Sequence, residues 1–425
     1  KSFLREEGVK MRFSEDFLSE LRARTDIEEL IGKYTEIKHR GSRTPVALCP
    51  FHAEKTPSFV IYRDTQSYYC FGCGAGGDAI TFIKNIERLD YTEAVRFLCE
   101  RAGMNMPLDP VDDEYNRIRR RCYEANREAA KFFYSALFSP EAVPAREYLD
   151  KRRLKPETVK HFGLGYAPDS WDSLIKHMRE KGFSVNELYE ADLVKKSTKN
   201  GERFYDNFRN RMMTPIIDIR GNVIGFGGRV LDDSKPKYVN TADTLVYKKS
   251  HEVFAMNYAK YIIYGYPIMI GSFVLNNAKE DFLIVAEGYM DVIALHQAGF
   301  TNAVACLGTA LTSEQASLLS RYASEIMIAY DADEAGQKAA TRALQIFKNT
   351  PAKIKVLRLS GGKDPDEIIK NYGVEKMKAI INGAANEIEF ALLREHSKYD
   401  VASDDGKRQY LRSAIEILSN VGAVE

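Results

Sequence analysis

The sequence predicts a multidomain protein that combines α/β and α+β parts, and three observations lead to this prediction. The chain has 425 residues, more than a single hydrophobic core usually serves, so two or three domains are expected. Closely spaced cysteines lie among short strand-like segments between residues 45 and 73. From Asp281 onward, apolar strand patterns alternate with helical patterns, which is typical of a parallel sheet with crossover helices.

The composition is that of an ordinary globular protein. Hydrophobic residues make up 44% and charged residues 28% of the chain, which excludes wholesale disorder and membrane embedding. The N-terminus lacks the apolar core of a signal peptide, and no stretch reaches the ~20 apolar residues of a spanning helix. Cys99, Cys122 and Cys306 are scattered, as in a reducing compartment. We therefore expect a cytoplasmic protein with no membrane contact and no structural disulfide.

The net charge of +1 arises from 61 basic and 60 acidic residues, so the chain as a whole does not carry the charge of a nucleic-acid binder. Any basic surface must be local. Between Arg203 and Lys249, nine basic residues occur against five acidic ones. This stretch therefore has a local excess of positive charge.

Apolar patterns divide the first hundred residues into short elements. Thr25 and Glu28 form a capping-box pattern that predicts a short helix before the cysteines. The further predicted elements are strands near 46–48, 59–61 and 68–71 and helices over Asp78–Glu87 and Tyr91–Arg101. Segment 105–113 contains two prolines and three aspartates and predicts a domain boundary.

Four candidate metal ligands occur as two pairs. Cys49-x2-His52 and Cys70-x2-Cys73 are separated by 17 residues, a spacing that suits one tetrahedral zinc ion. Gly72 and a second glycine would let the backbone fold around the metal. Four protein ligands leave no open position for a water molecule, so the zinc is expected to be structural. Coincidental cysteines in a small core are the alternative, which the two spacings together disfavour.

Aromatic and basic side chains occur together beside these ligands: Phe59, Tyr68, Tyr69, Phe71, Lys55 and Arg63. This mixture of stacking faces and charges favours binding of single-stranded nucleic acid. About half of the aromatic residues are expected only to pack the core of the small domain.

Carboxylates follow three apolar strands in the last third of the chain. The first strand ends at Glu287, a turn at Gly288 follows, and Asp291 falls in the first turn of the next helix. The second strand ends in Asp331-Ala332-Asp333, whose two acids should point to the same side of an extended segment. Because open α/β sheets bind ligands at the carboxyl ends of their strands, these acids are candidates for one site.

The third strand leads through a glycine-rich turn to Asp364 and Asp366. Each acid alone is more often a helix cap or a solvated turn residue. Their repetition after three strands favours magnesium, which prefers oxygen ligands and bridges phosphates, and therefore phosphoryl or nucleotidyl transfer. The G-x-x-x-x-G-K-[ST] loop of NTP-driven motors is missing from the sequence. His296 is expected to be a structural residue on a helix.

The regions on either side of these motifs are less regular. Residues 126–280 mix helices with strands, including 213–219 and 222–226 joined by a turn at Arg220-Gly221. Segment 261–275 is apolar but interrupted by glycine and proline, and we expect a local insertion or a repacked strand there. The last fifty residues show helical patterns without a terminating signal, so the chain is expected to be a fragment of a longer protein.

Three blocks of the sequence resemble the bacterial DNA primases of the DnaG type. They are CPFHAEKTPSF with YYCFGCGAGGD, RNRMMTPIIDIRGNVIGFGGRVLDD with PKYVN, and EGYMDVIAL with YDADEAG. The resemblance runs through most of the 425 residues. EGYMD and DAD alone would indicate only the wider TOPRIM group, which also includes topoisomerases and nucleases.

The resemblance implies a domain order. A zinc-ribbon template-binding domain (12–104) and a linker (105–125) would precede the mixed α+β N-terminal subdomain of an RNA polymerase core with a basic ridge (126–280). A TOPRIM-like metal-binding α/β subdomain with a parallel sheet (281–370) and a helical subdomain (371–425) would follow.

The resemblance also implies roles for single residues. The main magnesium-binding acids would be Glu287, Asp331 and Asp333, and the supporting carboxylates of the catalytic centre would be Asp291, Asp364 and Asp366. The residues that would guide template and incoming nucleotides are Arg229, Lys237, Tyr238 and Lys248, with Arg152 and Arg211 as further candidates.

The function implied is that of a DNA primase, a DNA-dependent RNA polymerase that makes short RNA primers on single-stranded DNA from ribonucleoside triphosphates. The protein would be a monomer with one structural Zn²⁺ and two or more catalytic Mg²⁺ or Mn²⁺ ions. A replicative helicase would bind through a C-terminal domain absent from these residues. Two alternatives stay open, namely another TOPRIM enzyme with nuclease or topoisomerase activity and a zinc-ribbon DNA-binding module without catalysis.

Overall fold

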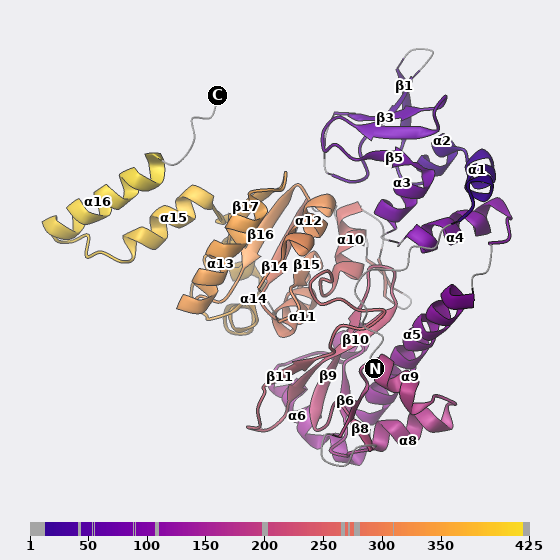
Figure 1. The fold of residues 1–425 in the computed structure, drawn as a ribbon. Helices are drawn as coiled ribbons and strands as arrows, with labels where there is room; N and C mark the ends of the chain where they lie inside the picture. Colours follow the sequence, from indigo (N-terminus) through magenta and orange to yellow (C-terminus); the bar gives the residue numbers. More distant parts are fainter. Residues whose placement is uncertain are drawn as a thin grey trace. The chain divides into compact units, whose positions relative to one another are not determined.

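The computed structural model describes residues 13–40, 44–52, 54, 56–87, 89, 91–106, 110–197, 203–264, 268–270, 273–275, 281–308 and 310–419. The chain divides into two compact units, Lys1–Ile118 and Arg119–Glu425. The elements of both are labelled in Figure 1.

The first unit is built on a five-stranded antiparallel sheet in which each strand pairs with the next in the chain. The strands are β1 (Ile37–Arg40), β2 (Thr44–Ala47), β3 (Phe59–Tyr62), β4 (Ser67–Cys70) and β5 (Gly76–Asp78), and the helices are α1 (Glu15–Ala23), α2 (Ile27–Ile31), α3 (Ala79–Ile86) and α4 (Tyr91–Ala102). The rings of Phe51, Phe59, Tyr68 and Phe82 pack against one another in its core. The predicted strands and helices of this region are confirmed to within a few residues.

The predicted capping box before the cysteines is wrong by one residue. Asp26 is the N-cap of α2, and its side chain accepts a hydrogen bond from Glu29 N at 2.8 Å. The Thr25 hydroxyl instead donates to Leu21 O at 2.8 Å and closes the preceding helix. A threonine and an aspartate in sequence can both cap a helix, and here the hydroxyl is used at the end of α1.

A long helix, α5 (Pro110–Ala136), runs through most of the segment expected as a linker. It begins at a proline, which fits the first turn of a helix because that position needs no N–H donor. The two compact units divide within it, after Ile118.

The second unit begins with a four-stranded antiparallel sheet of order β11-β10-β9-β6. These strands are β6 (Gly165–Ala167), β9 (Arg211–Ile217), β10 (Val223–Val230) and β11 (Tyr238–Asn240). The helices are α6 (Val143–Lys151), α7 (Pro156–Phe162), α8 (Ser173–Glu180) and α9 (Val185–Glu190), and β7 (Val194–Lys196) pairs with β8 (Phe204–Asp206). Gly221 has φ +94° in the turn between β9 and β10, a conformation that favours glycine. The predicted turn is therefore confirmed.

A second sheet of order β15-β14-β16-β17-β18 follows in the same unit (Figure 1). The strands β14 (Phe282–Ala286), β15 (Ala303–Ala305), β16 (Glu325–Ala329) and β17 (Lys353–Val356) are parallel, and β18 (Ala385–Asn386) is antiparallel. The connecting helices are α11 (Tyr289–Gln297), α12 (Ser313–Tyr322), α13 (Glu334–Phe347) and α14 (Pro365–Asn382). This confirms the predicted parallel sheet. His296 is buried on α11, and its Nε2 lies 2.8 Å from Ala303 O, which fits the structural role expected of it.

The apolar segment 261–275 contains the end of α10 (Met256–Tyr264) and a hairpin of β12 (Ile268–Ile270) and β13 (Phe273–Leu275). The hairpin is a separate two-stranded sheet, and whether the segment is an insertion stays a prediction. Helices α15 (Glu387–His396) and α16 (Asp404–Ser419) follow the second sheet, as the helical patterns predicted. Across the described residues, every helix is too short or too polar to cross a membrane.

Candidate metal centres

The cysteines and the histidine of the first unit converge on one point. The ligand atoms of Cys49, His52, Cys70 and Cys73 all lie within 4.8 Å of one another. The distance between Cys49 Sγ and Cys73 Sγ is 3.8 Å, close to the edge of a tetrahedron whose zinc–sulfur bonds are ~2.3 Å long. The four residues therefore have the spacing and the chemistry of a four-coordinate zinc site.

Two glycines allow the second pair of ligands to wrap around this point. A Cβ added to Gly72 would lie 2.7 Å from His52 Nε2, so a larger residue would displace the imidazole. Gly74 has φ +74°, in the left-handed region that favours glycine.

Glu54 supports the site and was not predicted from the sequence. Its carboxylate accepts a hydrogen bond from Cys49 N at 2.7 Å and lies 3.3 Å from His52 Nε2. The other ring nitrogen of His52, Nδ1, is 3.7 Å from Cys70 Sγ. Glu54 would thus hold the imidazole with Nδ1 toward the metal, as carboxylates commonly do for metal-bound histidines. Such a residue has no fixed spacing from the ligands, so the sequence gives no signal for it.

The aromatic residues beside the ligands divide into a buried and an exposed pair. Phe59 and Tyr68 are buried, and their rings stack at 5.0 Å. Tyr69 is 42% exposed and Phe71 is 69% exposed, with ring centroids 5.1 Å apart. This agrees with the expectation that half of them pack the core.

Two basic residues, Lys55 and Arg63, are expected beside these aromatic side chains. Arg63 forms an ion pair with Glu28 of α2, with Nη2 to Oε1 at 2.6 Å. Its charge is therefore partly neutralised within the unit. Lys55 lies outside the described residues.

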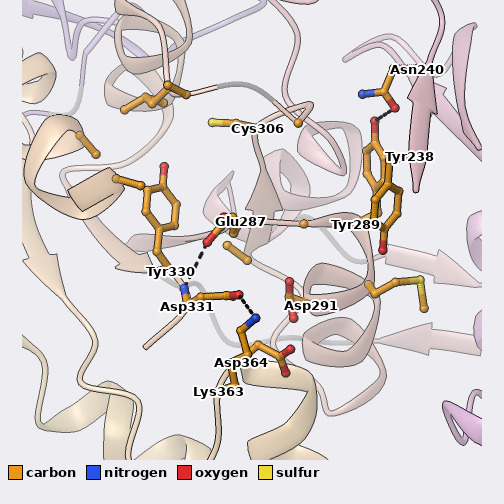
Figure 2. Close-up of a pocket in the computed structure, with 18 of the residues that line it drawn as sticks. Tyr238, Asn240, Glu287, Tyr289, Asp291, Cys306, Tyr330, Asp331, Lys363 and Asp364 are labelled. Atoms are coloured by element: carbon orange, nitrogen blue, oxygen red, sulfur yellow. Dashed lines mark hydrogen bonds and ion pairs between the residues drawn. The ribbon is translucent and has the colours of Figure 1, made fainter. Parts of the chain in front are cut away.

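In the second unit, the acids stand at the carboxyl ends of neighbouring parallel strands (Figure 2). Ala286 of β14 pairs with Ala329 of β16, so Glu287 and Asp331 follow these strands at the same edge of the sheet. The Asp331 N–H donates to Glu287 Oε2 at 3.3 Å. The structure thus brings together acids from two separate strand ends.

Two further acids cap helices at this edge. Asp333 accepts from Gly336 N at 2.9 Å as the N-cap of α13, and Asp364 accepts from Glu367 N at 2.7 Å as the N-cap of α14. A Cβ added to Gly336 would lie 2.0 Å from the Asp331 carbonyl oxygen, so only glycine fits this turn. Helix capping was the alternative interpretation of a single acid. Asp333 and Asp364 both cap a helix and lie near the strand ends.

Gly288 lies at the bend between β14 and α11, where the sequence predicted a turn. Its φ of −133° and ψ of 165° are those of extended backbone, and it is the N-cap of α11. A Cβ added here would lie 3.2 Å from Asp291 Oδ2, so a larger residue would have to shift the Asp291 side chain by a few tenths of an ångström.

Asp291 and Asp366 are buried among the other acids, 9% and 8% exposed. Burial raises the pKa of Asp291 to about 8, and the charges of Asp364 and Asp331 act in the same direction. Burial likewise raises the pKa of Asp366, although Arg152 forms an ion pair with this carboxylate and opposes the shift. Burial also raises the pKa values of Glu287 and Asp331. Ionised oxygens crowded in this way fit a site for divalent cations, which favour the charged form.

Lys363 lies between two of the acids and was not predicted as a site residue. Its Nζ is 3.4 Å from Asp331 Oδ2 and 3.4 Å from Asp333 Oδ2. These contacts hold the pKa of Asp333 below its usual value, together with the hydrogen bond from Gly336 N, which has the larger effect.

A cavity of about 610 Å³ opens onto the acids. Its lining includes the acids Glu287, Asp291, Asp331 and Asp364, together with Arg152, Lys237 and Tyr238 as basic and aromatic members. Figure 2 shows Tyr238 and Asn240 across the cavity from the acids. Asp333 and Asp366 stand next to the lining residues and are not part of the lining.

The remaining predicted basic residues lie away from the cavity lining. The Arg229 guanidinium packs over the Tyr148 ring at 4.4 Å, and Arg152 approaches the same ring at 5.6 Å. Arg211 donates to Gly228 O at 3.1 Å and to Pro236 O at 3.2 Å, so it ties its own sheet together. Lys248 is exposed.

Tyr289 at the start of α11 and Asn240 of β11 also line the cavity and connect these two elements, and sequence reasoning missed them. The Tyr289 hydroxyl donates to Asn240 Oδ1 at 2.8 Å, and Asn240 Nδ2 donates to Leu307 O at 2.9 Å. A Cβ added to Gly227 would lie 2.5 Å from the Tyr289 ring. From the sequence, a tyrosine in the apolar first turn of a helix is expected to be a core residue. The sequence contains no signal for its hydrogen-bond partner, which lies far away along the chain.

Three families match consecutive parts of the chain. Residues 13–114 match the CHC2 zinc finger, residues 132–260 match the N-terminal domain of the DNA primase catalytic core, and residues 284–369 match a Toprim-like domain. These matches coincide with the cysteine–histidine cluster, the antiparallel sheet and the parallel sheet with its acids.

Several DNA primases are similar to the chain over most of its length. The DNA primase of Clostridium acetobutylicum is 38% identical over 97% of this chain and 66% of that protein, and the Escherichia coli DNA primase is 35% identical over 95% and 68%. The chain spans 60 to 66% of the length of the Clostridium, Deinococcus and Pseudomonas proteins.

Solved structures give the same result. The crystal structure of the Aquifex aeolicus primase, comprising its zinc binding and RNA polymerase domains, is 33% identical with a TM-score of 0.57 and covers 96% of this chain and 95% of that one. A DnaG primase catalytic domain bound to single-stranded DNA is 33% identical with a TM-score of 0.57 and covers 72% of this chain and 94% of that one.

Proposed function

Because this chain belongs to the DnaG-type DNA primase family, we propose that it synthesises short RNA primers on single-stranded DNA. One observation carries the proposal: acids from separate strand ends share a single cavity with Arg152, Lys237 and Tyr238. Such a cavity offers oxygen ligands for cations together with positive charge for phosphates. These are the two requirements of nucleotidyl transfer.

Glu287, Asp331 and Asp333 are the proposed ligands of two or more Mg²⁺ or Mn²⁺ ions, with Asp291, Asp364 and Asp366 as supporting carboxylates. Bound there, the ions would stabilise the negative charge that develops on the phosphoryl group and on the leaving pyrophosphate. The hydrogen bond that the Asp331 N–H donates to Glu287 Oε2 holds the Glu287 carboxylate beside the backbone of Asp331. The attacking group is the 3′-hydroxyl of a ribonucleotide, so no protein nucleophile is needed.

The basic and aromatic residues would hold the nucleotide and the template. Lys237 and Arg152 line the cavity and would attract the phosphates of an incoming ribonucleoside triphosphate. Tyr238 is 41% exposed and can stack on a base. Arg229 and Lys248 would extend this positive surface along the template, whereas Arg211 is engaged by its own sheet.

The first unit would hold the DNA template. A structural zinc ion bound by Cys49, His52, Cys70 and Cys73 would fix the turn that follows β4. Tyr69 of β4 and Phe71 of that turn present exposed rings, which could stack on unpaired bases. We place the whole reaction in the cytoplasm at the replication fork, where single-stranded template becomes available.

Primer synthesis tests the proposal directly. The protein is incubated with single-stranded DNA, magnesium and labelled ribonucleotides, beside Glu287→Gln, Asp331→Asn and the matched control Glu375→Gln, an exposed acid of α14. Short RNA should form with the wild type and the control and fall at least about 100-fold in the two acid variants, because each removes a charged ligand.

A different outcome would point to another TOPRIM enzyme. If no RNA forms with magnesium or manganese but the DNA is nicked, relaxed or degraded in a Glu287-dependent manner, the primase assignment fails. The zinc-binding-module alternative would be supported instead if DNA binds normally and no Glu287-dependent chemistry occurs.

A further inference from the structure

Lys363 places a positive charge inside the acidic centre, and the proposed reaction gives it no role. Its Nζ is 3.4 Å from one oxygen of Asp331 and 3.4 Å from one oxygen of Asp333. Figure 2 shows the ammonium group reaching Asp331 from the loop before Asp364. A single side chain therefore bridges two of the proposed magnesium ligands.

The main chain fixes this lysine beside the acids. Ala332, between the two aspartates, donates its N–H to Lys363 O at 2.9 Å. The Lys363 N–H donates to Glu367 Oε2 at 2.6 Å. Because the backbone is held on both sides, the Lys363 side chain starts from a fixed point beside the aspartates.

Lys363 is also the main local source of positive charge for these aspartates. In the described part of the chain, no other lysine or arginine forms an ion pair with Asp331 or Asp333. The nearby guanidinium of Arg152 is engaged by Asp366. Removal of Lys363 would thus leave the two aspartates without a compensating charge in the metal-free protein.

We propose that Lys363 is a tethered counter-ion that a divalent cation must displace, so that it determines how tightly and how selectively the acidic centre binds metal. This inference rests on the proposed metal-binding role of Asp331 and Asp333. The ammonium charge on Asp331 Oδ2 and Asp333 Oδ2 competes with a cation for the same oxygens, because it repels the cation and offsets the negative charge that would attract it. A monovalent ion would replace one unit of charge by another, whereas a divalent ion gains charge by the exchange.

The magnitude follows from the exposure of the pair. The Lys363 side chain is 58% exposed, and ion pairs of this kind are individually weak. Two such contacts should weaken metal binding by about three- to thirty-fold relative to a chain without the lysine charge.

The test is direct titration of Mn²⁺ into the whole chain without nucleotide or DNA, with free Mn²⁺ followed by electron paramagnetic resonance. Lys363→Met removes the charge and keeps most of the length, Lys363→Arg keeps the charge, and Lys348→Met removes a lysine that pairs with Glu387 elsewhere in the unit. We expect Lys363→Met to bind Mn²⁺ about three- to thirty-fold more tightly than the wild type. Lys363→Arg and Lys348→Met should stay within about two-fold of the wild type.

The outcomes separate this inference from the proposed function. If Mn²⁺ binds the wild type and Asp331→Asn abolishes binding, but Lys363→Met binds no more tightly than the wild type, the counter-ion role is wrong and the metal centre stands. Equal tightening in Lys348→Met would also overturn the inference, because the effect would then come from net charge. If the wild type binds no Mn²⁺ in an Asp331-dependent way, the proposed metal centre itself fails, and the inference with it.

Discussion

The two candidate metal centres of this protein are built in opposite ways. The zinc site takes all four ligands from a short stretch, Cys49 to Cys73, within one small antiparallel sheet. The acidic centre draws Glu287, Asp331 and Asp364 from separate strand ends and shares its cavity with Arg152 and Lys237. The first is a local structure that a metal completes, and the second is a product of the whole fold of its unit.

This difference predicts how each centre depends on its cation. The first unit has a small core and closes around four soft or borderline ligands, so its folding should be coupled to zinc. The parallel sheet carries a large apolar core and should fold without magnesium. Without metal, its crowded carboxylates repel one another, and a bound cation would remove this repulsion.

Substitution of a zinc ligand should give the largest effect. We expect Cys70→Ser to lose zinc and to unfold the first unit, since structural zinc sites contribute on the order of 10 kcal/mol, while the second unit stays folded. Cys99→Ser is the matched control, because Cys99 is buried in the same core and is not one of the four clustered ligands. Zinc content and hydrogen exchange over residues 56–87 measure the outcome. A folded, zinc-free Cys70→Ser first unit would contradict the coupling of zinc to folding.

Substitution of Asp291 should have the reverse effect on stability. Its folded-state pKa of about 8 exceeds the ~3.9 of an unfolded chain, so the carboxyl favours folding at low pH and opposes it as the pH rises toward 8. Asp291→Asn stays neutral and should raise the free energy of unfolding of the metal-free protein by about 2 to 5 kcal/mol near pH 9. Near pH 4 the gain should vanish.

Urea unfolding in magnesium-free buffer between pH 5 and 9 measures this change, with Asp405→Asn on the exposed side of α16 as the control. The stability of the wild type should decline with pH, and that of Asp291→Asn should decline less. A pH-independent difference between the two would mean that the buried carboxylate is ionised throughout.

The contrast between the centres also explains what could be predicted from the sequence. The zinc ligands were found because ligand spacing is a property of the local chain, and the acids at the strand ends were found because apolar strands mark the edge of a parallel sheet. Glu54, Lys363 and Tyr289 were missed because their roles depend on contacts that no spacing encodes. Arg211 was grouped with the basic ridge, whereas its donors are used within its own sheet.

Substitution of Tyr148 should give the smallest effect. It tests whether contacts outside the cavity lining contribute to the second centre. Its ring lies under the guanidinium of Arg229 at 4.4 Å and near that of Arg152 at 5.6 Å, so it should hold both cations toward the template. Cation–π contacts of this kind are worth about 0.5 to 2 kcal/mol. Tyr148→Leu should therefore weaken binding of single-stranded DNA by about three- to ten-fold, measured by fluorescence anisotropy at fixed salt.

Tyr148→Phe is the matched control, because it keeps the ring and removes only the hydroxyl. Among the described residues this buried hydroxyl has no hydrogen-bond partner, so its loss should cost nothing in stability and leave DNA affinity unchanged. Equal weakening in both variants would assign the effect to the hydroxyl and not to the ring. Unchanged affinity in Tyr148→Leu would mean that Arg229 and Arg152 reach their positions without the aromatic platform, so that the second centre is less dependent on distant contacts than its geometry implies.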